Sequence, residues 1–395
     1  MLVVAAVALT RVLDDAQHVA PRPSPAVSVV EPGLATVAVQ SLQTAIRDGD
    51  SAGAAALAPV GDERSAARLS AIVDNARELD LRSVSLRYVD QASGIDVDGR
   101  WSAAVDVSWQ IHGFDPGPSR TEVTVHLRSE EGRVAVEYVG GGSRRSPLWL
   151  TDRLEVRRTS TTLVMAAASV DDVERYARLA ERAVPTVRAV VPTWPGGLVV
   201  EVPRTEAGLD RMLDASVGTY SSIAAVTASV DGELSATSPV HVFVNPSQFD
   251  RLREQGAQVV MSHEATHAAT GAETSRAPLW LIEGFADYVA LRDVDLPITT
   301  TAAQAIEQVR ADGPPAQLPG TAEFDITTAH LGAAYESAWI ACALLAERGG
   351  ETALVALYDA TAAGADLDTA LEQSFGLSIA QLTGLWQERL ADLAL

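Results

Sequence analysis

Apolar residues recur every three or four positions in two segments of residues 34–80, LATVAVQSLQTAIRDGD and DERSAARLSAIVDNARELD. This spacing predicts two amphipathic helices. The period then changes to two. Val105, Val107, Trp109 and Ile111 alternate with polar residues, and runs at 123–127 and 134–138 do the same. Alternation predicts strands with one buried face, and the turn sequences GFDPGPS and SEEGR separate them.

Residues 34–150 are therefore expected to form an α+β domain in which helices cover one face of an antiparallel sheet. This pattern resembles the NTF2-like cone fold. His112 and His126 fall in strand contexts, so we interpret them as ordinary sheet residues rather than as ligands. This part of the chain contains no recognisable catalytic set of residues.

Strands and helices alternate in the next part of the chain, assigned to a second domain at 155–395. TTLVMAAAS, GGLVVEVP, SSIAAVTASV and PVHVFVNPSQF predict strands, whereas TEAGLDRMLDA and DDVERYARLAERAVPTVRAVV predict helices, the latter capped near Ser169 or Asp171. From about residue 300 the pattern is mainly helical. The expected fold class is α+β, with an antiparallel-sheet domain followed by a domain whose C-terminal part is helical.

The segment EQGAQVVMSHEATHAATG carries the first candidate chemistry. It predicts a helix that ends at Gly271, a residue suited to a left-handed cap. His263 and His267 are four residues apart, so both imidazoles face the same side and can reach one ion. Glu264 lies about 100° around the helix from His263. A carboxylate in that position can take a proton from metal-activated water.

A third ligand is needed, because catalytic zinc takes three protein ligands and leaves a fourth position for water. The segment APLWLIEGFADYVALRD supplies candidates on a second predicted helix, with Pro278 in its first turn. Glu283 could complete a His, His, Glu site. Asp287, one turn later, could accept the ring N–H of a ligand histidine and fix its tautomer.

HEATH followed by PLWLIEGFADYVA resembles the gluzincin zinc metallopeptidases, most closely their bacterial peptidase MA-like branch, and the similarity extends over about residues 155–395. The resemblance implies a zincin-type domain with one zinc ion bound by His263, His267 and Glu283. It implies Glu264 as general base and an acidic residue at Asp287 that orients a ligand histidine. Peptides or proteins are the implied substrates.

The resemblance also implies a tyrosine that supports the oxyanion, for which Tyr335 in HLGAAYESAWIACALLAERGG is the candidate. His330 competes for this role, and Tyr335 could equally be a packing residue at a helix start. The chain lacks the G-x-M-E-N segment with which aminopeptidases bind a substrate amine. This departure favours an endopeptidase.

Two other interpretations compete with the enzyme. One is a catalytically silent zincin-fold protein that binds or scaffolds at the cell surface; the intact Glu264 disfavours it, since such a protein needs no base. The other is a structural protein in which HEATH is a solvated helix face. Glu283 and Asp287 disfavour that interpretation.

The net charge of the chain bears on whether it binds nucleic acid. The 395 residues carry a formal net charge of −22, and all 30 basic residues are arginine, with no basic cluster. Nucleic-acid binding depends on clustered cations, so we expect no nucleic-acid partner. The single cysteine, Cys342, excludes an internal disulfide, and its apolar surroundings indicate a buried residue rather than a nucleophile.

Residues 1–33 predict a location. MLVVAAVALT is apolar but too short to span a membrane, and the Pro-rich segment APRPSPAVSVVEPG reads as an extended linker. Together they resemble a signal or membrane anchor without its beginning, upstream of residue 20. A frayed apolar terminus is the alternative. The anchor implies an extracytoplasmic protein, either membrane-anchored or secreted.

Overall fold

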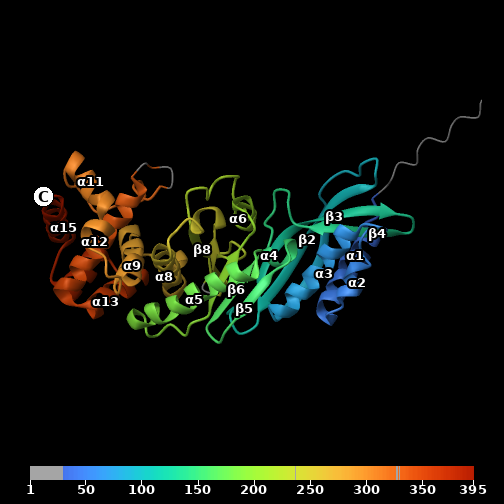
Figure 1. The fold of residues 1–395 in the computed structure, drawn as a ribbon, viewed down its shortest axis with the longest axis horizontal. Coiled ribbons are helices and arrows are strands. Elements are labelled where there is room, and N and C mark those ends of the chain that lie inside the picture. The colour runs from blue at the N-terminus through green and yellow to red at the C-terminus, as the bar shows by residue number, and fades with distance from the viewer. Residues whose placement is uncertain (1–29, 236, 326–327, 329) are drawn as a thin grey trace, which may run out of the picture.

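The computed structural model describes residues 30–235, 237–325, 328 and 330–395. The N-terminal part of the chain consists of helices followed by a meander (Figure 1). Its elements are α1 (Pro32–Asp48), α2 (Ser51–Ala55), α3 (Glu63–Glu78), β1 (Leu81–Gln91), β2 (Arg100–Ile111), β3 (Ser119–Glu130) and β4 (Arg133–Val139). The strands are antiparallel in the order β1-β2-β3-β4, and α1 and α3 pack against the sheet.

Apolar and polar residues alternate along the strands of this sheet because one face is buried and the other is partly exposed. Val105 and Val107 of β2 lie in one core with Val123 of β3 and with residues of α1 and α3, while Asp106 and Ser108 face the other side and are only half-buried. Strand β1 had no counterpart among the predicted strands. Its register shifts between Arg82 and Ser85 and again near Tyr88, so bulges interrupt the two-residue period that would have predicted it.

A short helix, α4 (Leu148–Thr151), leads to a second sheet with strand order β5-β6-β7-β9-β8. Its strands are β5 (Glu155–Arg158), β6 (Thr162–Ala166), β7 (Leu198–Val202), β8 (Ala225–Ser229) and β9 (Val240–Val244). Strands β6, β7 and β9 are parallel, and the outer strands β5 and β8 are antiparallel to their neighbours. Helix α5 (Val170–Val190) connects β6 to β7, and α6 (Glu206–Met212) lies between β7 and β8. Helix α7 (Pro246–Phe249) follows β9 and leads out of the sheet.

Both faces of the second sheet are buried. Val164 and Val200 share a core with α5 and with the histidine-bearing helix, whereas Leu163, Met165 and Phe243 belong to the core of the N-terminal part. A strand buried on both faces reads as a mostly apolar run, as TLVMA and LVVEV do apart from Thr162 and Glu201. The N-terminal part is therefore a packed layer against this sheet, and one core crosses the junction near residue 150.

The remaining helices lie at the end of the molecule opposite the first sheet (Figure 1). They are α8 (Glu254–Thr270), α9 (Leu279–Leu291), α10 (Ile298–Thr301), α11 (Ala303–Asp312), α12 (Leu331–Gly349), α13 (Glu351–Ala362), α14 (Leu367–Phe375) and α15 (Ile379–Ala394), with a 3-10 turn at Ala272–Thr274. The predicted α+β class, with its N-terminal antiparallel sheet and mainly helical C-terminal part, is confirmed.

The predicted signal or anchor at the N-terminus lies outside the described residues, as does most of the Pro-rich linker. Among the residues that the structure describes, no helix is both long enough and apolar enough to cross a bilayer.

Candidate metal centre

Helix α8 presents the two histidines as the spacing predicts. It runs from Glu254 to Thr270 and ends at Gly271, which adopts the left-handed conformation with φ 62° and donates its backbone N–H to the carbonyl of His267. A residue with a Cβ is strained in this conformation, so glycine suits the end of the helix. The chain then turns through residues 272–278 into α9, which packs against α8.

Helix α9 brings Glu283 and Asp287 to the same side as the histidines. Pro278 occupies the position just before the first helical residue, Leu279. The next helix layer is unusually close at Gly284: a Cβ there would lie 2.3 Å from the carbonyl oxygen of Ala338 in α12. Because Gly284 has no Cβ, α12 packs directly against α9 at this position, next to Glu283.

Three potential ligand atoms converge between the two helices. Nε2 of His263 and Nε2 of His267 are 2.9 Å apart, and Oε2 of Glu283 is 3.2 Å from each. Zinc bonds of roughly 2.0–2.1 Å in a tetrahedron give ligand-to-ligand edges of about 3.3 Å. These three atoms could hold one metal ion, and their spacing fits a tetrahedral zinc site.

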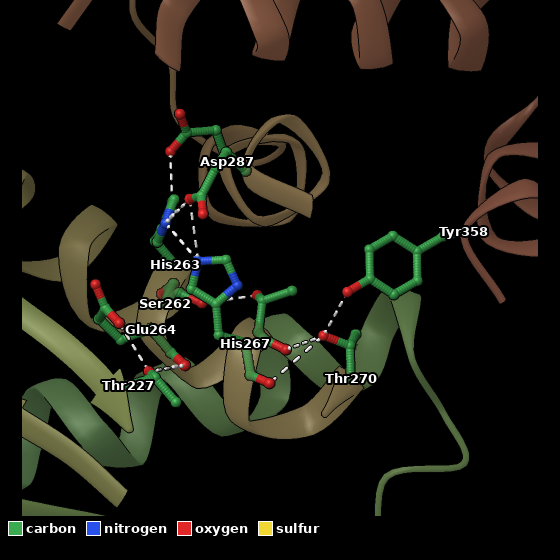
Figure 2. Close-up of polar contacts among 10 residues, drawn as sticks. Thr227, Ser262, His263, Glu264, His267, Thr270, Asp287 and Tyr358 are labelled. Atoms are coloured by element: carbon green, nitrogen blue, oxygen red, sulfur yellow. Dashed lines mark hydrogen bonds and ion pairs between the residues drawn. The ribbon is translucent and has the colours of Figure 1, made fainter. Parts of the chain in front are cut away.

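Asp287 holds one of the two imidazoles in place. Its Oδ1 lies 2.7 Å from Nδ1 of His263 (Figure 2). Nε2 of the same ring lies 3.2 Å from Oε2 of Glu283. Burial by itself would lower the pKa of His263, but the Asp287 carboxylate, with help from Glu283 and Glu264, raises it well above its ordinary value. Nδ1 of His267 is buried without a hydrogen-bond partner among the described residues, so the two histidines are not held equally.

The charge of the site suits a cation. Burial would raise the pKa of Glu283, but the imidazoles of His267 and His263 lower it well below its ordinary range, so this carboxylate stays ionised. Glu264, next to His263 on α8, and Asp287, one turn after Glu283 on α9, add two more carboxyl groups beside the site. A site of this composition could hold a cation.

Glu264 is 8% exposed and is not one of the three converging residues. Its Oε2 accepts a hydrogen bond from Oγ1 of Thr227 at 2.7 Å, which holds the carboxylate toward β8 (Figure 2). Glu264 also lines a cleft of about 290 Å³ together with His263 and Asp287. A carboxylate beside the ligand set and open to a cleft is placed to accept a proton from water.

The rest of the cleft is mainly apolar. Its walls include Ile223 just before β8 and Ala225 at the start of that strand, Val259 and Val260 from α8, and Leu331 and Tyr335 from α12. The ring of Tyr335 lies with its centroid 6.0 Å from that of His263 and 5.2 Å from that of Phe324. Burial, together with the nearby carboxylates, raises the pKa of Tyr335, so its hydroxyl remains protonated at neutral pH.

The structure thus places His263, Asp287, Glu264 and Tyr335 along one cleft, and His267 and Glu283 converge with His263 beside it. His330 is exposed at the start of α12 and does not line this cleft. Thr227 was not among the candidates from the sequence: VTAS predicts only a strand, and nothing local indicates that its side chain meets a residue 37 positions later.

The residues interpreted from the sequence as non-functional lie elsewhere. His112 is exposed and pairs with Asp80, and His126 stacks on Tyr138 with a pKa lowered by burial. Cys342 is fully buried in α12, where burial raises the pKa of its thiol well above the usual range. A buried, protonated thiol is a poor nucleophile, as expected for a packing residue.

Neither a comparison with models of protein families nor a comparison with curated proteins finds a match for this chain. The case for a metal centre therefore rests on the geometry of α8, α9 and the cleft beside them.

Proposed function

We propose that this protein is a zinc-dependent metallopeptidase of the gluzincin type, acting as an endopeptidase. The observation that carries the proposal is the convergence of Nε2 of His263, Nε2 of His267 and Oε2 of Glu283 at 2.9–3.2 Å, beside a base that faces an apolar cleft. A resemblance of HEATH and WLIEGFADY to gluzincin motifs supports it further. We propose one zinc ion per chain with these three residues as ligands.

Zinc in such a site supplies Lewis-acid polarisation of a carbonyl and activation of water. The protein supplies the rest. Glu264 takes the proton of the attacking water and delivers it to the departing amine, so that one carboxylate acts first as base and then as acid. Tyr335, protonated and beside His263, donates its hydroxyl hydrogen to the developing oxyanion.

The cleft suits an extended, uncharged stretch of peptide. Strand β8 is at the edge of its sheet, and an edge strand offers free backbone groups for a peptide to pair with. Ile223, Val259 and Val260 provide an apolar wall near the base. The net charge of −22 disfavours acidic substrates through long-range repulsion.

The metal is tested first, by elemental analysis of the purified full chain beside a His263→Ala variant. We expect about one zinc per chain, and its loss in the variant. No zinc in either protein, even after reconstitution with zinc salt, would remove the basis for the proposal.

The activity is then tested with peptide libraries blocked at both ends, which only an endopeptidase can cleave. Glu264→Gln should retain zinc and lose most of the rate, by about 100-fold or more, because the amide cannot accept the proton. A chelator should abolish cleavage and added zinc should restore it. Zinc bound without any cleavage by the wild type would instead indicate a catalytically silent zincin-fold binding or scaffold protein.

A further inference from the structure

Strand β8 places one hydroxyl against the proposed base. In the sheet order β5-β6-β7-β9-β8, β8 is the outer strand, and Thr227 at its centre pairs with Val242 of β9. Oγ1 of Thr227 lies 2.7 Å from Oε2 of Glu264 and 2.9 Å from the backbone carbonyl oxygen of the same residue. These contacts join the sheet to the helix that carries both histidines (Figure 2).

The hydroxyl of Thr227 has one hydrogen to donate, and two acceptors are within reach. An ionised carboxylate is the stronger acceptor, and it is also the nearer one here. When the hydrogen points at Oε2, rotation of the Glu264 carboxylate about its terminal bond is restricted.

The two oxygens of Glu264 are consequently unequal. Oε2 is engaged by Thr227, whereas Oε1 accepts no hydrogen bond from any residue that the structure describes, and the side chain lines the cleft. A fixed Oε2 leaves Oε1 as the oxygen available to a water molecule. Orientation of this kind matters because a displacement of about 1 Å in a reacting group can lower a rate by about 100-fold.

We propose that Thr227 is a positioning residue for catalysis: its hydroxyl fixes the carboxylate of Glu264 so that Oε1 faces the attacking water. This inference rests on the proposed function, because it assigns Thr227 a role in the same reaction. Thr227 touches neither the metal ligands nor the reacting atoms. It acts through Glu264 alone, so its removal should change turnover without changing metal binding.

The test compares Thr227→Val, which keeps the shape and removes the hydroxyl, with Thr227→Ser, which keeps the hydroxyl. We expect Val to lower kcat by about 10-fold to 100-fold with KM and zinc content unchanged, and Ser to restore most of kcat. Thr383→Val serves as control, because that half-buried threonine only donates to the Ile379 carbonyl of its own helix. Equal kcat in wild type and Thr227→Val would overturn the proposal, as would an equal loss in Val and Ser.

A second measurement needs no substrate. The unfolding midpoints of zinc-saturated wild type, Thr227→Val, Glu264→Ala and the double variant form a double-mutant cycle. We expect non-additive shifts, since each single change removes the same hydrogen bond. Additive shifts would overturn the contact and with it the positioning role. A wild type that cleaves no peptide but shows non-additive shifts would overturn the proposed function and leave the contact established. If Thr227→Val does not fold, Thr227→Ala replaces it in both experiments.

Discussion

Asp115 and His241 meet across the junction of the two sheets, with Oδ1 of Asp115 3.0 Å from Nε2 of the imidazole. Asp115 lies in the turn between β2 and β3, and His241 lies on β9, 126 residues later. Nδ1 of the same ring is 2.7 Å from Oε1 of Glu201 on β7. All three side chains are buried. One imidazole therefore joins a loop of the N-terminal layer to the central strands of the second sheet.

This arrangement predicts a pH dependence of stability. Burial would lower the pKa of His241, but the two carboxylates raise it from 6.5 to about 9. Because the folded state holds the proton more tightly than the unfolded state, the stabilisation is complete below about pH 6.5. It is lost as the pH rises through about 9, and its size is about 3 kcal/mol. Urea unfolding at a series of pH values from 6 to 10 measures it.

His241→Gln leaves two buried carboxylates without their cation and should cost about 3–5 kcal/mol at pH 6.5. The variant should also lose the fall in stability between pH 6.5 and 9. His112→Gln is the control, since His112 is 65% exposed in its pair with Asp80, and should change little. A wild-type stability that does not vary over this pH range would contradict the charged state assigned to His241.

Removing the orienting carboxylate should weaken metal retention. Asp287→Asn keeps the size of the side chain but removes the negative charge of the carboxylate that accepts a hydrogen bond from Nδ1 of His263. We expect zinc affinity to fall by about 10-fold to 100-fold, as measured by competition with a chromogenic chelator. Asp293→Asn, just beyond the same helix and 73% exposed, should leave the affinity unchanged. Equal affinities of wild type and Asp287→Asn would show that Asp287 does not orient the ligand.

Gly284→Ala should destabilise the protein, because the new Cβ would lie 2.3 Å from the Ala338 carbonyl and 2.9 Å from Sγ of Cys342. Helices α9 and α12 must separate to admit it, at a cost of about 1–3 kcal/mol. Gly384→Ala is a matched change within helix α15, where nothing lies within 4 Å of the added atom. There alanine should be neutral or stabilising by up to ~1 kcal/mol. Denaturant midpoints of the two variants should therefore move in opposite directions or by clearly different amounts.

Tyr335→Phe distinguishes an oxyanion donor from a packing residue. If the hydroxyl acts in the reaction, kcat should fall by about 100-fold while the unfolding midpoint and zinc content stay the same. Tyr288→Phe provides the comparison, since the Tyr288 hydroxyl donates to Glu351 outside the cleft. Peptide cleavage at wild-type rates by Tyr335→Phe would leave Tyr335 as a wall of the cleft only.

Local order in the sequence was enough to predict several elements of this protein. The spacing of His263 and His267 places both on one helical face, and Gly271 ends that helix as predicted. Glu283 and Asp287 follow the same rule on α9. Alternation predicted β2, β3 and β4 because one face of each is buried. These features depend on the 3.6-residue period of helices and the two-residue period of strands, and either period can be recognised within a short segment of sequence.

The tertiary structure decided the features that depend on contacts between distant segments of the chain. Bulges interrupt the two-residue period of β1, so its sequence pattern did not predict a strand. Strand β5, an edge strand of four residues with charged side chains, was not predicted either. The contact of Thr227 with Glu264 spans 37 residues, and that of Asp115 with His241 spans 126. Such pairs form only when separate layers pack together, so their partners depend on the arrangement of whole sheets and helices. The sequence alone determined which residues could bind a metal; the packing of α8, α9, α12 and β8 decided how they meet.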